Sequence, residues 1–246
     1  MAEFNTIRTS TASGARAQID QGLRTHMNKV YGTMSVGMLL TFLVAWAVGT
    51  SPELLGIFRD PMTLQPNILG WIAMFAPLIM VFAFSAMINK LSAAAAQAFF
   101  YAFAAVMGLS LAWIFVAFTG FSIAQVFLVT SISFAGLSLF GYTTQKNLSG
   151  MGTFLMMGVI GLIVASVINI FLGSPAIMFA ISILGVLIFA GLTAYDTQSI
   201  KNEYIEHARH ADSEWLGKSA IMGALRLYLD FINMFMFLLQ LLGNRE

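Results

Sequence analysis

The sequence predicts an all-α integral membrane protein that folds as one bundle of seven transmembrane helices. Of its 246 residues, 59% are hydrophobic and only 9% are charged, and the mean hydropathy is +0.83. Soluble domains carry about 25% charged residues. Seven apolar segments each approach the ~20 residues that a helix needs to cross a ~30 Å hydrocarbon core. The chain therefore has no room for a soluble domain.

Residues 1–29 are polar, rich in Ser and Thr, and mildly basic. The apolar run begins only at Val30 and is long enough to span, which is not the short apolar core of a signal peptide. We therefore expect residues 1–29 to be a solvated cytoplasmic tail and residues 30–243 to be the bundle.

The spans follow in order, and two of the connections between them, 51–66 and 199–220, are long. Short links such as Thr119-Gly120 make the flanking helices antiparallel neighbours. Glycines are spread through the spans and predict close helix packing. We place the spans at about 30–50, 67–89, 95–118, 121–143, 150–172, 176–198 and 221–242. The glycines are Gly32, Gly37, Gly108, Gly136, Gly141, Gly158, Gly161, Gly185 and Gly191.

The distribution of Lys and Arg predicts the orientation, because cytoplasmic connections carry the excess of basic residues. One side of the predicted bundle collects Arg8, Arg16, Arg24, Lys29, Lys90, Lys146, Lys201, Arg209 and Lys218. The other side has Arg59 and Arg245. We therefore expect a cytoplasmic N-terminus and, with seven spans, an external C-terminus.

Composition argues against several classes of function. A net charge of +1 provides no basic stripe for a nucleic acid. The absence of cysteine removes disulfides, thiolate metal sites and a cysteine nucleophile. His26, His207 and His210 all lie outside the predicted spans, so a histidine metal site or a Ser-His dyad within them is not expected. We expect neither an enzyme nor a protein with a bound cofactor.

The seventh segment, Ile221 to Leu242, is apolar but carries a polar stripe. At about 100° per residue, its polar side chains fall within roughly an 80° arc of a helix. Such a stripe cannot face lipid, because a charge at membrane depth is expensive and normally points into a bundle or a water-filled cavity. The stripe consists of Arg226, Asp230, Asn233, Phe237 and Gln240.

Asp196, near the end of the sixth segment, is the expected partner of Asp230. It shares a helical face with Ser182, Gly185, Phe189 and Thr193. If Arg226 extends to the membrane interface, Asp230 lies about one turn deep and the two aspartates can meet. Two other arrangements stay open at this stage. Asp196 can be solvated by headgroups, and Asp230 can pair with Arg226 one turn earlier on its own helix.

Two facing carboxyl groups in a low-dielectric interior cannot both ionise cheaply, so they share one proton. The protonated pair can hold the sixth and seventh helices together through a hydrogen bond. The doubly ionised pair repels and offers hard oxygen ligands for a transient calcium contact at Asp196 and Asp230. The pattern therefore predicts a proton-controlled gate.

The stretches 194–201, AYDTQSIK, and 224–235, ALRLYLDFINMF, resemble the sixth- and seventh-helix signatures of the Bax inhibitor-1 family, the transmembrane Bax-inhibitor-motif proteins. The resemblance covers the chain from about Val30 to Gly243. The run 98–110, AFFYAFAAVMGLS, is similar to the family's third helix. The pairing of YDTQ with LYLDFIN at this separation is the more specific signal.

This resemblance implies seven helices with the seventh at the centre, and a pH-sensitive calcium leak gated by Asp196 and Asp230. Calcium would be the permeant ion and protons the regulator. Some relatives carry an arginine cluster that can latch an aspartate, where this chain has Asn89 and Lys90. Arg226 departs from the family pattern, because it stands where we expect no charge, and either Lys90 or Arg226 can replace the arginine cluster as the latch. Possible latch or modulator residues are therefore Arg226, Lys90 and Asn233.

Two other functions remain alternatives. A proton-coupled secondary transporter also uses buried acids, but would show a broken helix or an inverted repeat. An intramembrane aspartyl protease has a similar pair of aspartates, but its second motif needs glycines where this chain has Leu227-Tyr-Leu-Asp230. We expect the lipid bilayer and calcium as partners. A chain without cysteine and with a short tail favours a bacterial plasma (inner) membrane, and hence a prokaryotic family member.

Overall fold

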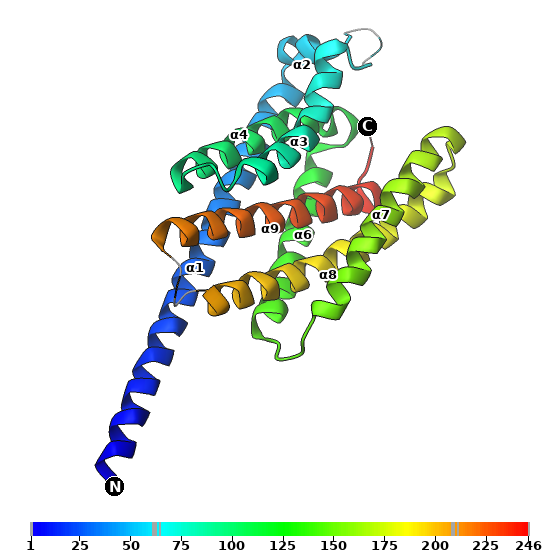
Figure 1. Cartoon of the computed structure of the whole chain (residues 1–246). Helices are drawn as coiled ribbons and strands as arrows, with labels where there is room; N and C mark the ends of the chain where they lie inside the picture. Colours follow the sequence, from blue (N-terminus) through cyan, green and yellow to red (C-terminus); the bar gives the residue numbers. More distant parts are fainter. Residues whose placement is uncertain (1, 61–62, 64, 208–209, 211, 246) are drawn as a thin grey trace.

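A computed structural model describes residues 2–60, 63, 65–207, 210 and 212–245. Within this part of the chain every regular element is a helix, and seven helices are long and apolar enough to cross a membrane (Figure 1). The seven-span prediction is confirmed at this level. The helices are α1 (Ala2–Thr50), α2 (Pro52–Phe58), α3 (Ile68–Met87), α4 (Ala93–Leu111), α5 (Ile114–Ala117), α6 (Gly120–Thr143), α7 (Ser149–Leu172), α8 (Pro175–His207) and α9 (Ser213–Leu242). Arg209, which we counted in the charge asymmetry, lies outside the described residues.

Short polar side chains define where several helices begin. The side chain of Asn67 accepts a hydrogen bond from the Gly70 amide, and Ser92, Thr119 and Asp212 cap α4, α6 and α9 in the same way. Such caps satisfy backbone donors that have no partner within the helix. At the end of α7, Gly173 adopts a left-handed φ of 59°, which glycine reaches without a steric penalty. These local signals set the reversals between antiparallel neighbours.

The N-terminal segment departs from the solvated tail that we expected in its last part, where side chains pack on the bundle. It is helical from Ala2 and continuous with the first span, and Leu23, His26 and Met27 are buried in the bundle. The His26 ring packs against the Tyr204 ring of α8 at a tilt of 35°, with centroids 4.8 Å apart. His26 therefore belongs to the spanning helix, which extends over Ile19–Thr50, whereas we expected the span to begin only at Val30. The last turns of this segment pack against the bundle because apolar side chains such as Leu23 and Met27 lie on one face of the helix, among otherwise polar residues.

The connection between the last two spans is much shorter than predicted. We expected a link over residues 199–220, but α8 continues to His207 and α9 begins at Ser213. Hydropathy reports where the apolar stretch ends, whereas a helix continues for as long as its backbone bonds and packing allow. The first long loop also contains a short helix, α2, and the third span is divided into α4 and α5 at Ala112 and Trp113.

Of the seven spanning helices, α9 is the most buried. More than half of its most apolar stretch, 56%, is buried, compared with no more than 33% for any other span. It packs against α1, α4, α6 and α8, and the side chains of Ile221, Leu227, Tyr228 and Leu239 are completely buried. Of the polar stripe only Asp230 is buried, whereas Arg226, Asn233, Phe237 and Gln240 are partly exposed, so the expected enclosure by protein holds for Asp230 and not for the whole stripe.

The glycines of the spans divide into two groups. A Cβ on Gly141 would lie 2.2 Å from the Ala194 carbonyl oxygen, and one on Gly108 would lie 2.5 Å from the Thr41 carbonyl oxygen. These glycines allow helix backbones to touch. The prediction of close packing is wrong for Gly32, Gly136 and Gly161, because a Cβ there would meet no atom within 4 Å.

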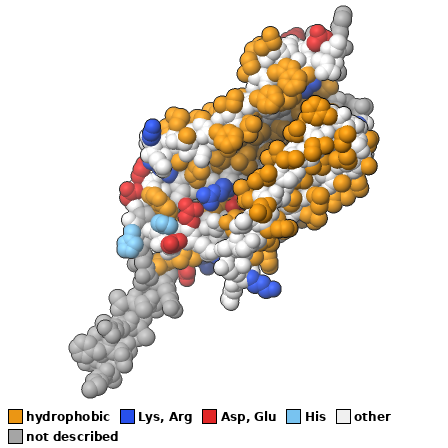
Figure 2. Space-filling view, turned by 45° about the vertical axis from the view of Figure 1, so that its right-hand side comes forward, with side chains coloured by type: hydrophobic (Ala, Val, Ile, Leu, Met, Phe, Trp, Pro, Cys, Tyr) orange, Lys and Arg blue, Asp and Glu red, His pale blue; other side chains and the backbone are white. Residues whose placement is uncertain are grey.

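The outer surface is strongly apolar. Figure 2 shows hydrophobic side chains over most of one face, with charged and histidine side chains gathered towards the end where α1 leaves the bundle. Large side chains such as Ile68, Phe82, Phe121 and Phe171 are more than two-thirds exposed. In water, exposed apolar area on this scale would drive association, so this surface is that of a protein solvated by lipid.

Candidate functional site

The polar stripe of α9 lies against α8, and the two helices run antiparallel. We call this contact the α8–α9 seam. Successive pairs along it join Glu203 to Arg226, Asp196 to Asp230, Phe189 to Phe237, and Ser182 to Gln240. Residue numbers fall along α8 as they rise along α9, which fits the faces that we predicted for both helices. The seam therefore assembles ionisable, aromatic and amide groups in one line.

Asp196 and Asp230 meet in this seam. Their carboxyl groups lie close enough to interact with each other. Asp230 is only 4% exposed, and Asp196 is half-buried. The Oδ2 atom of Asp230 is buried without a hydrogen-bond donor in the described structure. Two ionised carboxylates are acceptors only, so a hydrogen bond between these groups requires one proton.

The Arg226 guanidinium points to a residue that we did not predict. Its Nη1 atom lies 3.5 Å from Oε2 of Glu203, and both side chains are partly exposed. Arg226 is still close enough to interact electrostatically with Asp196 and Asp230. The local pair of Arg226 with Asp230 is therefore not the ion pair that forms. Glu203 was missed because we assigned residues 199–220 to a connection, although it lies seven residues from Asp196 on the same helical face.

The other two suggested modulators differ in position. The Asn233 side chain bonds to the Leu229 carbonyl of its own helix, at 2.8 Å, one turn from Asp230. Lys90 is exposed in the segment after α3. Within the described residues Lys90 forms no ion pair with Asp196 or Asp230, so it latches neither aspartate in this structure.

Comparison with known proteins shows which family the chain belongs to. The family model described as "Inhibitor of apoptosis-promoting Bax1" matches residues 23–246, almost the whole chain. The chain belongs to the Bax inhibitor-1 family. The match begins at Leu23, where the side chains of α1 begin to pack on the bundle, and it includes Asp196 and Asp230.

Bacterial relatives cover this Bax inhibitor-1 family member along nearly its full length. The inner membrane protein YbhL of Escherichia coli strain K12 is 46% identical over 225 residues, which is 92% of this chain and 94% of the relative. A protein of Caulobacter vibrioides is 42% identical over 252 residues, covering both chains completely. A protein of Rickettsia prowazekii is 39% identical over 241 residues, 97% of this chain and 98% of that one. The family member is thus a multi-pass membrane protein with an inner-membrane relative.

Hydroxyl groups tie α8 to the rest of the bundle beside the aspartates. The Tyr31 hydroxyl of α1 lies 2.5 Å from Ser138 of α6, and Ser138 lies 2.9 Å from Thr197, the residue after Asp196. All three come from different helices, so sequence reasoning had no spacing by which to group them. Hydrogen bonds between membrane helices contribute roughly 0.6–2 kcal/mol each, which holds α8 against α1 and α6.

Asp196 and Asp230 alone do not complete a binding site for a calcium ion. In the described part of the family member, no three His, Asp or Glu side chains gather into a metal-binding group. A stable calcium site takes about six to eight oxygen ligands. Two carboxyl groups supply at most four, so calcium would keep much of its water at this position.

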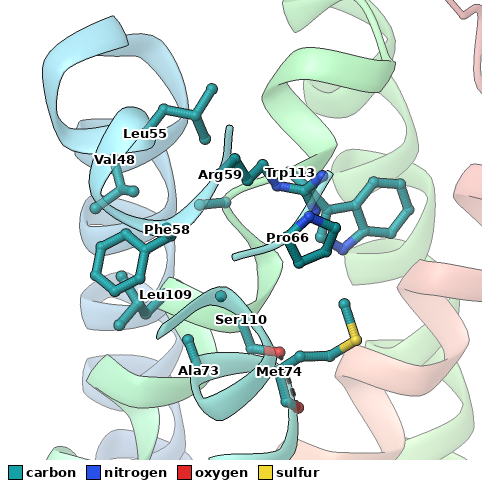
Figure 3. Close-up of a pocket in the computed structure, with 12 residues that line it drawn as sticks. Val48, Leu55, Phe58, Arg59, Pro66, Ala73, Met74, Leu109, Ser110 and Trp113 are labelled. Atoms are coloured by element: carbon teal, nitrogen blue, oxygen red, sulfur yellow. Dashed lines mark hydrogen bonds between the residues drawn. The ribbon is translucent and has the colours of Figure 1, made fainter. Parts of the chain in front are cut away.

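A separate pocket lies at the far end of the bundle and shares no residue with the seam. It is lined by residues of α1 to α4, the loop before α3 and the turn between α4 and α5, including Arg59, Ser110 and Trp113 (Figure 3). Its volume is about 20 Å³, enough for roughly one water molecule. The Ser110 hydroxyl there bonds to the Met74 carbonyl, at 3.5 Å. This pocket is a packing feature, and the seam remains the candidate site.

Proposed function

We propose that this protein is a pH-sensitive calcium leak channel in which Asp196 and Asp230 form the gate. The observation that carries the proposal is the contact of two carboxyl groups, one on α8 and one on α9, where Asp230 is buried and one of its oxygens has no donor. Membership in the Bax inhibitor-1 family supports it.

The gate responds to protons through the charge of the pair. With one proton shared, a hydrogen bond joins α8 to α9 and closes the seam. With both groups ionised, the carboxylates repel by roughly 4 kcal/mol at about 4 Å and an effective dielectric constant of 20. The seam then opens and presents hard oxygen atoms to calcium. Flux should therefore be low in acid and should rise towards neutral and alkaline pH.

The proposed orientation places the N-terminus and the connection between α8 and α9 in the cytoplasm, with α9 as the axis of the bundle. The excess of Lys and Arg on that side supports this orientation. The burial of α9 supports its place at the axis. The aspartate pair would then lie nearer the cytoplasmic end and respond to cytoplasmic pH.

The same observations favour a channel over an enzyme. Asp230 stands between Leu229 and Phe231 on a helix whose surroundings are closely packed. A protease aspartate needs open backbone beside it so that a substrate can approach. We therefore propose that the protein has no enzymatic activity, and that its partners are the bilayer, calcium and protons.

Calcium flux in liposomes tests the proposal. The purified protein is reconstituted in vesicles loaded with a calcium-sensitive dye, and the downhill calcium flux is measured between pH 5 and pH 8. We expect flux to rise with pH and to lose its pH dependence in Asp196→Asn and Asp230→Asn. Asp20→Asn, which changes an exposed carboxylate on α1, is the matched control.

An absence of calcium flux at every pH, or unchanged pH dependence in both pair variants, would contradict the leak. Saturable flux that requires a proton gradient would identify a proton-coupled transporter instead. Complete cleavage of a membrane-helix substrate, lost in both variants, would identify an aspartyl protease.

A further inference from the structure

A pair of aromatic rings interrupts the seam between its polar ends. Phe189 of α8 and Phe237 of α9 stack with centroids 5.9 Å apart and an angle of 28° between the rings. The Phe237 ring also covers Gly185, where a Cβ would lie 2.5 Å from the ring. The ring thus rests on the α8 backbone itself, and only glycine leaves room for it.

The acidic pair lies on one side of these rings. Asp196 is seven residues from Phe189, and Asp230 is seven residues from Phe237. At 1.5 Å per residue both separations are about 10 Å, or two helical turns. Asn233 lies between Asp230 and Phe237 on the same stripe of α9. It provides a position from which solvent access to the acidic side can be measured.

A polar contact and a pocket lie on the other side. The Ser182 hydroxyl is 3.0 Å from Oε1 of Gln240. Gln240 also lines a cavity of about 210 Å³ with Trp113, Phe118, Met178 and Arg245. The cavity lies at the end of the bundle where Arg245 approaches the Phe118 ring, at 5.8 Å. A cation that travels along the seam would have to pass from the acidic pair to this pocket through the aromatic contact.

Aromatic rings in this place oppose ion passage for a simple reason. They offer no oxygen ligand that could replace the water of a calcium ion, and an apolar constriction excludes water and so closes a pore without a charged group. Because the contact is made by side chains over a glycine, it can open when one ring changes rotamer, without separating the helices completely.

We propose that Phe189 and Phe237, with the Phe237 ring packed on Gly185, form a second and proton-insensitive barrier in the seam, between the aspartate pair and the Gln240 pocket. This barrier rests on the proposed function in one respect, namely that the seam is the permeation path. In this proposal, proton sensing and the exclusion of ions are carried out by different residues. The aspartates sense protons, and the rings keep water and ions of the pocket side away from the acidic pair.

Thiol accessibility tests the barrier without requiring calcium flux. The chain has no cysteine, so a single introduced thiol is the only target. Asn233→Cys places it on the acidic side of the rings and Gln240→Cys places it on the pocket side. A charged, membrane-impermeant methanethiosulfonate is added to the compartment that the pocket faces, and the labelling rate of the full-length protein in vesicles is measured at pH 5.

We expect Gln240→Cys to react at least tenfold faster than Asn233→Cys. Adding Phe237→Ala or Phe189→Ala to Asn233→Cys should raise its rate at least tenfold, whereas Phe237→Leu should not, because it keeps an apolar plug. Phe231→Ala is the matched control, since it removes a buried ring of α9 that packs on Phe127 and Phe134 of α6. That change loosens the core without opening the seam.

Equal labelling of Asn233→Cys and Gln240→Cys in the presence of both rings would overturn the barrier. The same holds if Phe231→Ala accelerates labelling as much as Phe237→Ala. The labelling result can be distinguished from the result of the calcium-flux test. A labelling pattern as expected in a protein without calcium flux would retain the barrier and reject the leak, and calcium flux with unprotected Asn233→Cys would do the reverse.

Discussion

Arg226 forms its ion pair with Glu203 across the seam and not with Asp230 on its own helix, with 3.5 Å between Nη1 and Oε2. This ion pair bears on how strongly the positive charge of Arg226 acts on the carboxyl groups of Asp196 and Asp230. Glu203 offsets the guanidinium charge while Arg226 remains electrostatically coupled to Asp196 and Asp230. We therefore expect Arg226 and Glu203 to tune the proposed gate from outside the aspartate pair.

The first prediction concerns Glu203→Gln. Without its partner, Arg226 would act more strongly on the aspartates and favour their ionised form. We expect the pH of half-maximal calcium flux to fall by roughly 0.5–1 unit, where one unit corresponds to about 1.4 kcal/mol. Arg226→Gln should move it in the opposite direction. The measurement is liposome flux as a function of pH.

Glu206→Gln is the control for this series, because Glu206 is an exposed carboxylate one turn further along α8. A shift of the same size in Glu206→Gln would mean that the flux responds to general surface charge. The coupling through Arg226 would then be wrong.

Much of the site followed from the sequence because membrane burial leaves few alternatives. A polar stripe on an apolar helix must face protein, and the depth of Arg226 then placed Asp230 level with Asp196. Hydropathy located the seven spans for the same reason. Both inferences depend on the high free-energy cost of placing a polar side chain in lipid. This cost is reflected directly in the pattern of polar and apolar residues of a single sequence.

Glu203 and the packed part of the N-terminal segment could not be predicted in the same way. Both lie in polar stretches, where hydropathy does not distinguish a solvated helix from one that packs on a neighbour. His26 contacts Tyr204, and the two are 178 residues apart in sequence. Glycine roles were equally hidden, because whether Gly136 or Gly141 touches another helix depends on residues far away in the chain.

The second prediction concerns the buried hydrogen bond between Tyr228 and Thr41. The two hydroxyls lie 2.6 Å apart, and Thr41 also approaches the carbonyls of Gly37 and Ala104. A carbonyl only accepts, so Thr41 donates to a carbonyl and the Tyr228 hydroxyl donates to Thr41. The contact joins α1, α4 and α9 at the most buried part of the bundle.

Thr41→Val should destabilise the protein more than Tyr228→Phe. The valine variant leaves the buried tyrosine hydroxyl without an acceptor, at a cost of about 1–3 kcal/mol, whereas the phenylalanine variant leaves Thr41 bonded and costs about 0.6–1 kcal/mol. Each kcal/mol lowers the Tm of a domain this size by about 2–4 °C. Thermal unfolding in detergent measures the difference. An equal or reversed order would contradict this assignment of donors.

The last prediction concerns the contact between α6 and α8 at Gly141. A Cβ added there would lie 2.2 Å from the Ala194 carbonyl oxygen, which is backbone and cannot turn aside. Gly141→Ala must therefore push α8 away from α6, within two residues of Asp196. We expect a Tm reduced by several degrees, consistent with the 1–3 kcal/mol or more that overpacking a core costs.

Gly136→Ala on the same helix is the matched control. Gly136 is exposed and a Cβ there meets nothing within 4 Å, so alanine should leave the Tm unchanged or raise it slightly through its better helix propensity. Because Gly141 also sets the position of α8 beside the proposed gate, we expect Gly141→Ala to alter the pH dependence of calcium flux and Gly136→Ala to leave it unchanged. If both alanine variants behaved alike, the close approach of α6 and α8 would not be what holds Asp196 against Asp230.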